Sequence, residues 1–196
     1  MPVAESELHY TNPFELLVAV VLSAQCTDKR VNQITPALFR AFPTPAEMAA
    51  ASVDAIYTYI QSVSYPNNKA KHLWALAQKL QQDFKGVVPD TLEQLQTLPG
   101  VGRKTASVVM AVAFNQPAMP VDTHVFRVAH RLGLVARKAT TPLAVEKELT
   151  HYIPKSEWAV AHHWLLLHGR YVCIARSPKC ATCGLGAICP SKSKKS

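Results

Sequence analysis

The sequence predicts an all-α protein. Apolar residues recur at three- and four-residue spacing through most of its 196 residues, which places them on one face of a helix. Few segments show the alternation of apolar and polar residues that a half-buried strand requires. Proline, asparagine and glycine separate the periodic stretches, as residues that interrupt helices do. With 48% hydrophobic residues, the chain can bury a core.

Ten segments carry the helical spacing. The first contains the apolar run LLVAVVL at 16–22, and the last three follow two prolines that interrupt helix between residues 115 and 120. In the sixth, Asp90 is the expected N-cap of a short helix, with Glu93 three residues on. The predicted helices cover residues 13–25, 29–42, 45–51, 53–62, 69–84, 92–97, 104–114, 124–132, 142–153 and 157–167.

Positive charge is concentrated in the second half of the chain. The net charge is +8, and residues 1–97 carry 7 Lys and Arg against 9 Asp and Glu, whereas residues 98–196 carry 14 against 4. A basic half of this kind predicts an anionic partner such as nucleic acid.

Nothing in the sequence suggests a membrane or an export signal. No segment approaches the roughly 20 apolar residues that span a bilayer. The opening MPVAESE has acids where a signal peptide needs positive charge. We therefore expect no membrane partner and a location in the cytoplasm of a bacterium, associated with the nucleoid, or in an organelle or nucleus elsewhere.

The motif LPGVGRKTA at 98–106 is not a nucleotide-binding loop. A Walker-type loop needs glycine directly before Lys104, where Arg103 stands, and a dinucleotide fingerprint needs a third glycine and a preceding strand. Gly100 to Gly102 permit positive φ, so they can turn the chain between two helices. Such a hairpin exposes backbone N–H groups to a phosphate oxygen. Taken alone, the motif favours an ordinary helical corner.

Four of the five cysteines lie near the C-terminus with the spacing C-x6-C-x2-C-x5-C. In a reducing compartment they are not expected to form disulfides. Four thiolates this close in sequence predict either an iron–sulfur cluster or tetrahedral zinc, and the spacing alone leaves the metal open. The four are Cys173, Cys180, Cys183 and Cys189, while Cys26 stands apart as an expected small buried residue.

The motifs together resemble the endonuclease III family of helix-hairpin-helix DNA glycosylases. Besides LPGVGRKTA and the cysteines, the resemblance rests on LLVAVVLSAQCTD at 16–28, VDTHVFRVAHRLGL at 121–134 and HHWLLLHGRYVCIAR at 162–176. It implies a two-lobed, all-α fold. A six-helix barrel lobe over residues 13–116 would contain the helix-hairpin-helix, and an iron–sulfur cluster lobe would cover residues 117–196 together with 1–12.

By this resemblance Lys104 and Asp122 are catalytic. A lysine is protonated and a poor nucleophile near neutrality, but the first turn of a helix and the adjacent Arg103 disfavour its charged form. A carboxylate can stabilise positive charge developing at the sugar C1′ or move protons. Without the resemblance, Lys104 would be a surface lysine and Asp122 the N-cap of a helix beginning near Thr123.

The implied activity is that of a bifunctional DNA glycosylase and AP lyase of base excision repair. A monomer would bind duplex DNA at a damaged base or abasic site, remove oxidised pyrimidines and cleave the abasic site by β-elimination through a lysine imine. The resemblance also implies a 4Fe–4S cluster on the four cysteines. The expected DNA contacts are Gln25, Tyr65, Gly100, Val101, Gly102, Arg103, Thr105, His124, Arg176 and Lys179.

Two features depart from the family pattern. Ser64-Tyr65-Pro66 stands where relatives have Gly-Leu/Phe-Tyr, which puts the preferred lesion or opposite base in doubt. Few residues precede Asn12, where relatives carry a further basic helix, so the second lobe lacks that cover or the sequence starts downstream of it. The alternative functions are those of a mismatch or adenine-type glycosylase and of a non-catalytic helix-hairpin-helix protein that binds DNA. Adenine glycosylases usually lack a lysine at the position of Lys104 and carry a glutamate in the helix that corresponds to residues 18–22. This chain has the lysine and no acid at 18–22, which favours the glycosylase and lyase.

Overall fold

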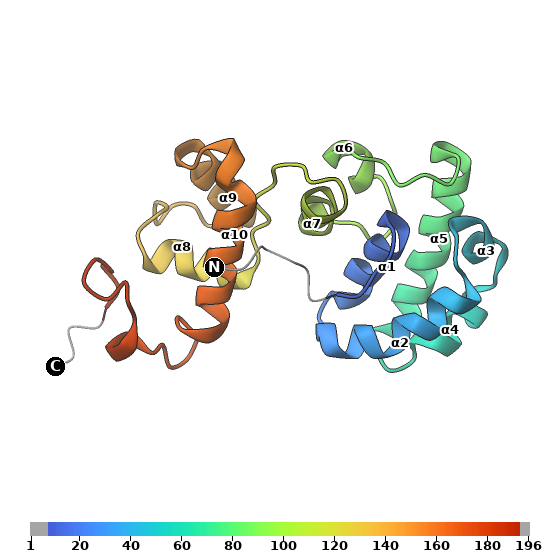
Figure 1. Cartoon of the computed structure of the whole chain (residues 1–196), viewed down its shortest axis with the longest axis horizontal. Helices are drawn as coiled ribbons and strands as arrows, with labels where there is room; N and C mark the ends of the chain where they lie inside the picture. Colours follow the sequence, from blue (N-terminus) through green and yellow to red (C-terminus); the bar gives the residue numbers. More distant parts are fainter. Residues whose placement is uncertain (1–7, 193–196) are drawn as a thin grey trace. The chain divides into compact units, whose positions relative to one another are not determined.

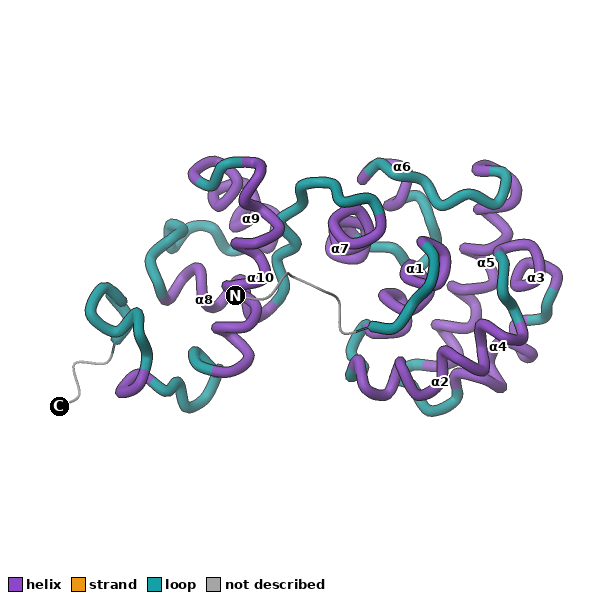
Figure 2. The backbone as a smooth tube through the Cα atoms, viewed as in Figure 1, coloured by secondary structure: helices purple, strands orange, loops and turns teal. Residues whose placement is uncertain are grey.

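A computed structural model describes residues 8–192, in which helices are joined by loops and turns and no strand is present (Figures 1 and 2). The all-α prediction is confirmed. The chain divides into two compact units, whose described parts are residues 8–116, the N-terminal unit, and residues 117–192, the C-terminal unit. No described helix has the length and apolar character needed to cross a membrane.

The N-terminal unit is built around one buried helix. Helix α1 packs against α2, α5 and α7, and eight of its eleven residues are buried (Figure 1). A helix that is apolar on all sides is stable only when neighbours surround it. The seven helices are α1 (Pro13–Ser23), α2 (Asp28–Ala41), α3 (Pro45–Ala50), α4 (Val53–Ile60), α5 (Pro66–Phe84), α6 (Leu92–Gln96) and α7 (Arg103–Ala113).

Residues 8–12 belong to this unit and not to the cluster lobe, which corrects the expectation for that segment. Leu8 is 7% exposed and joins the apolar core of the N-terminal unit. The backbone N–H of His9 donates to Oδ1 of Asn32 at 2.9 Å. The side chain of Asn12 caps α1. Burial of Leu8 and these hydrogen bonds hold the segment in place; residues 1–7 lie outside the described range.

The C-terminal unit has three α-helices and a long cysteine-bearing loop. Helix α8 (Thr123–Arg131) packs against α9 (Pro142–Tyr152) and α10 (Trp158–Tyr171). Their buried apolar side chains, Val125, Val128, Val145 and Leu165 among them, form a separate core. After α10, residues 172–192, called here the cysteine loop, contain only one short 3-10 turn.

Helix boundaries differ from prediction where a local residue decides them. Helix α5 begins at Pro66, three residues early, because proline suits the first helical turn. The N-cap of α6 is Thr91 rather than Asp90, and its side chain accepts from the N–H of Gln94 at 3.3 Å. Helix α10 continues to Tyr171, four residues beyond the predicted end.

Candidate active site and DNA-binding surface

The hairpin between α6 and α7 is a tight turn with a buried apolar side. The N–H of Leu98 donates to Leu95 O and that of Val101 to Leu98 O, both at 3.1 Å. Gly100 has φ +79°, whereas Gly102 has φ −82°, so only the first glycine needs its conformational freedom. Val101 is 6% exposed and its N–H donates within the turn, and its contact with DNA stays a prediction.

Helix α7 begins without a side-chain cap. Seven of the ten described α-helices have an N-cap side chain that accepts a backbone N–H, but Gly102 at this N-cap has none to offer. An N-terminus without a side-chain cap can bind an anion, because the helix dipole is positive there. Lys104 is exposed in the first turn, flanked by the half-buried Arg103 and Thr105. The prediction that Lys104 lies in the first turn of a helix is confirmed.

Asp122 is the N-cap of α8 in the C-terminal unit. Its Oδ1 accepts the N–H groups of His124 and Val125, each at 2.8 Å. These bonds fix the carboxylate at the positive end of α8, where a negative charge is favoured. Nη2 of Arg127 lies 3.2 Å from Nδ1 of His124. Arg127, one helical turn further along α8, therefore orients the ring of the histidine that the resemblance assigns to DNA.

Gly169 allows α10 to approach α8 at His124. A Cβ at Gly169 would lie 2.8 Å from the Cβ of His124 and 3.2 Å from Cγ2 of Val128. We expect Gly169→Ala to lower the free energy of unfolding by about 1–3 kcal/mol, because the helices must separate, and to weaken DNA binding through His124. Urea denaturation measures the first effect. Gly184→Ala, whose Cβ meets no atom within 4 Å and which lies outside every helix, is the stability control. A Gly169→Ala protein as stable as wild type would contradict the predicted clash.

Gln25 and Tyr65 lie in two loops of the N-terminal unit and are both exposed. Each has a left-handed backbone, with φ of 55° and 56° respectively. Ser64 Oγ donates to the backbone carbonyl of Gln25 at 2.5 Å, so the two loops are in direct contact. The structure thus brings together two of the residues that the sequence assigns to DNA.

Lys69 is a buried cation that closes the C-terminal end of α1. It is 6% exposed, and its Nζ donates to Leu22 O and Ala24 O, both at 2.7 Å. Burial lowers the pKa of Lys69 below its ordinary value of 10.5, and the nearby Cys26 opposes that shift. The amine therefore holds its proton less tightly in the native chain than in the unfolded one.

The lowered pKa of Lys69 predicts a pH dependence of stability. Unfolding takes up a proton at pH values between the lowered native pKa and 10.5, so native stability rises with pH through that window. The difference in unfolding free energy between wild type and Lys69→Met should therefore increase as the pH rises toward 10.5, and be smallest at lower pH. Urea titrations at several pH values measure it. A difference that shrinks with rising pH would mean that the two carbonyls hold the ammonium more strongly than water does.

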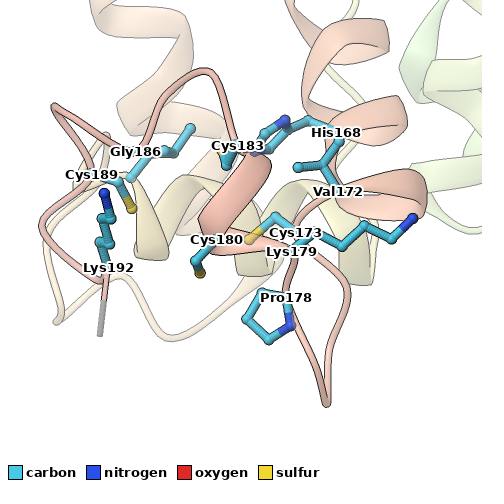
Figure 3. Close-up of a pocket in the computed structure, with 11 residues that line it drawn as sticks. His168, Val172, Cys173, Pro178, Lys179, Cys180, Cys183, Gly186, Cys189 and Lys192 are labelled. Atoms are coloured by element: carbon cyan, nitrogen blue, oxygen red, sulfur yellow. Dashed lines mark hydrogen bonds between the residues drawn. The ribbon is translucent and has the colours of Figure 1, made fainter. Parts of the chain in front are cut away.

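The cysteine loop and α10 surround a small pocket. Figure 3 shows the four cysteines on its wall together with His168 of α10. The volume of the pocket is about 30 Å³. Within residues 8–192 no three His, Cys, Asp or Glu side chains converge closely enough to hold a single metal ion. Four soft thiolates are nevertheless a donor set suited to iron–sulfur or zinc chemistry. The cysteines that line the pocket are Cys173, Cys180, Cys183 and Cys189.

Residues missed from the sequence surround these cysteines. Nε2 of His168 lies 3.8 Å from Sγ of Cys183, and burial lowers the pKa of His168 so that its ring is neutral near pH 7. Nη1 of Arg131 lies 3.4 Å from Sγ of Cys173 and also donates to Ile174 O at 2.9 Å. The helical spacing of Arg127 and Arg131 is a visible signal, but their partners lie more than 40 residues away along the chain.

Two predicted phosphate contacts lie in the segment between the first two of these cysteines. Arg176 and Lys179 are both exposed, as cations that contact a DNA backbone must be. The N–H of Lys179 donates to Val172 O at 2.9 Å, which turns the segment back toward α10.

Comparison with known proteins places this geometry in a family. Residues 18–155 match the family model described as HhH-GPD superfamily base excision DNA repair protein. The chain is 47% identical to Endonuclease III of Bacillus subtilis over 99% of this chain and 88% of that protein. It is 42% identical to Endonuclease III of Escherichia coli, over 98% and 90% respectively.

Solved structures give the same result. A trapped endonuclease III–DNA covalent intermediate superimposes with a TM-score of 0.92 at 46% identity, covering 97% of this chain and 89% of that one. A thermostable thymine-DNA glycosylase gives 0.84 at 25% identity, covering 94% and 86%. The hairpin, the lysine that follows it and the near full-length similarity agree, and the chain belongs to the endonuclease III family of the HhH-GPD superfamily of base excision DNA repair proteins.

Proposed function

We propose that this chain is a bifunctional DNA glycosylase and AP lyase that removes oxidised pyrimidines from duplex DNA and cleaves the resulting abasic site. One observation carries the proposal: Lys104 is exposed in the first turn of a helix whose N-terminus has no side-chain cap. A phosphate bound at that N-terminus would bring the sugar of a flipped nucleotide within reach of the lysine amine.

The chemistry requires a neutral amine at Lys104. Its nitrogen attacks C1′ of the flipped nucleotide, the bond from C1′ to the base breaks, and the base leaves with a proton. The sugar ring opens and leaves an imine between Lys104 and C1′. The imine acidifies the hydrogen on C2′. A general base therefore removes that proton, and the C3′–O bond breaks, which cuts the strand. Water then hydrolyses the imine and regenerates the lysine.

Asp122 supplies the second catalytic group of this proposal. Its carboxylate would stabilise the positive charge that develops at C1′, or help to move protons. The two backbone N–H donors on one oxygen orient the group before substrate arrives, which reduces the cost of reorganisation in the transition state.

The DNA contacts of the proposal come from both units. In the N-terminal unit the hairpin and the first turn of α7 would contact the phosphate backbone, through Gly100, Val101, Gly102, Arg103 and Thr105. Gln25 and Tyr65 would enter the space left by the flipped nucleotide. In the C-terminal unit His124, Arg176 and Lys179 would contact DNA. A duplex DNA substrate requires that the protein reach the genome, which in a bacterium is the nucleoid.

The four cysteines of the C-terminal unit fit a 4Fe–4S cluster. Cys173, Cys180, Cys183 and Cys189 are all half-buried thiols around one pocket, and none of the described residues that line it is a carboxylate. When bound, the cluster would act as a structural crosslink that orders the cysteine loop and presents Arg176 and Lys179 to phosphates.

We expect protein purified without air to contain about four iron and four sulfide ions per chain, as one 4Fe–4S cluster requires, and little zinc. Elemental analysis measures this. Chelation of the iron should weaken duplex binding and reduce its salt dependence, because the cations of the cysteine loop lose their fixed positions. One zinc per chain and no iron would contradict the cluster and favour tetrahedral zinc.

A panel of lesion duplexes tests the proposed reaction. Oligonucleotides carrying an oxidised pyrimidine, an adenine mismatch or a preformed abasic site are incubated with the protein, and released base and cleaved strand are measured separately. The proposal predicts release of oxidised pyrimidine together with a β-elimination product. Release from the mismatch alone would favour the mismatch or adenine-type glycosylase, and binding without any product would favour a non-catalytic protein.

A further inference from the structure

Gln25 occupies a turn position that normally requires glycine or asparagine. The N–H of Cys26 donates to Ser23 O at 3.0 Å, and the intervening Ala24 has φ −58° and ψ 114°. These values define a type II turn, whose third residue needs positive φ. Gln25 takes that place with φ 55°, a conformation that a residue with a Cβ rarely adopts.

Tyr65 is held in an equally unfavourable conformation. It is the N-cap of α5, with φ 56° and ψ 49° and without a side-chain cap bond, whereas an N-cap is normally extended. Pro66 follows, and a residue before proline is itself biased toward extended backbone. Its side chain is 63% exposed, so burial of the ring does not maintain this conformation.

Two side chains from one segment hold both loops. Ser64 Oγ donates to Gln25 O, and Lys69 Nζ donates to the carbonyls on the N-terminal side of Gln25, those of Leu22 and Ala24. The N–H of Lys69 also donates to Tyr65 O at 3.1 Å. Three carbonyls at the end of α1 and in the Gln25 loop thus accept from the segment that carries Tyr65. Strain held by surrounding structure in this way is a feature of preorganised sites.

We propose that Ser64 and Lys69 are positioning residues that hold Gln25 and Tyr65 as one preformed wedge for duplex DNA. This inference rests on the proposed function and adds which residues prepare the wedge. Because the two backbones are already fixed, insertion into the gap left by a flipped nucleotide does not require ordering of either loop. Relatives have glycine at the position of Ser64, so the hydroxyl that joins the two loops is a feature of the sequence Ser64-Tyr65-Pro66 in this chain.

Ser64→Ala tests the link because it removes only the donor to Gln25 O. Ser64→Thr keeps a hydroxyl and is the rescue variant, and Ser62→Ala alters an exposed serine two residues earlier as the matched control. Loss of one hydrogen bond predicts about three- to tenfold slower single-turnover excision from a lesion duplex. Cleavage of a preformed abasic site, which has no base to extrude, should change by less than about twofold. Ser64→Thr and Ser62→Ala should match wild type on both substrates.

A fluorescent base reports the wedge directly. With 2-aminopurine beside the lesion, Ser64→Ala should give a smaller fluorescence increase on binding than wild type, because the neighbouring base is less unstacked. Ser64→Ala should also have little further effect on excision in a Gln25→Ala background, since both changes act through one side chain.

Three outcomes would overturn the proposal: unchanged excision by Ser64→Ala, equal slowing on lesion and abasic duplexes without rescue by Ser64→Thr, or full additivity with Gln25→Ala. Failure of the proposed function is separately visible, because wild type would then neither cleave the abasic duplex nor be trapped on it by borohydride.

Discussion

Lys104→Gln should abolish strand cleavage at an abasic site and covalent trapping by borohydride. The change removes the amine that forms the imine, and loss of a nucleophile typically lowers turnover by on the order of 10³-fold or more. Single-turnover cleavage and a denaturing gel of the borohydride-treated complex measure the two effects. Duplex binding should persist, because the hairpin and the cations of the cysteine loop are unchanged.

Lys147→Gln is the matched control for this experiment. Lys147 is an exposed lysine of α9, so the control removes the same charge away from the hairpin. It should be trapped and should cleave like wild type. Trapping of Lys104→Gln at the wild-type level would show that another amine is the nucleophile.

Asp122→Asn should slow base excision by about 10²- to 10⁴-fold while leaving the fold intact. Asparagine is as good an N-cap as aspartate, so its Oδ1 can accept the same N–H groups of His124 and Val125. Only the negative charge is lost. Release of an oxidised base under single-turnover conditions measures the rate, and urea denaturation measures stability.

Asp122→Ala separates the two roles of this residue. It removes both the charge and the cap, so we expect excision as slow as in Asp122→Asn and an additional loss of about 1 kcal/mol in unfolding free energy. If Asp122→Asn excised at the wild-type rate, the carboxylate would be only a helix cap.

Local chemistry made much of the fold predictable. All ten predicted α-helices are present, because proline, asparagine and glycine separate segments with clear apolar spacing. The positions of Lys104 and Asp122 in the first turn and at the N-cap of their helices followed from a glycine hairpin and a capping residue. Leu8 was assigned to the wrong unit because a short apolar segment carries no signal for its packing partner.

Contacts between distant segments could not be predicted. The hydrogen bond from Ser64 to Gln25 joins residues 39 apart, and Lys69 reaches Leu22 across 47 residues. Arg127 reaches Gly169 O across 42 residues at 2.8 Å, which links α8 to the end of α10. Such contacts depend on how helices pack, and periodicity describes only which face of a helix is buried. The positioning of the site therefore became visible only in the folded chain.

Mapping of the borohydride-trapped complex tests the central claim most directly. Wild-type protein is trapped on an abasic-site duplex, digested with protease and nuclease, and the peptide that retains the sugar remnant is identified by mass spectrometry. The account predicts attachment to Lys104 alone. Attachment to another lysine or to the N-terminal amine, or the absence of a trapped species, would contradict it.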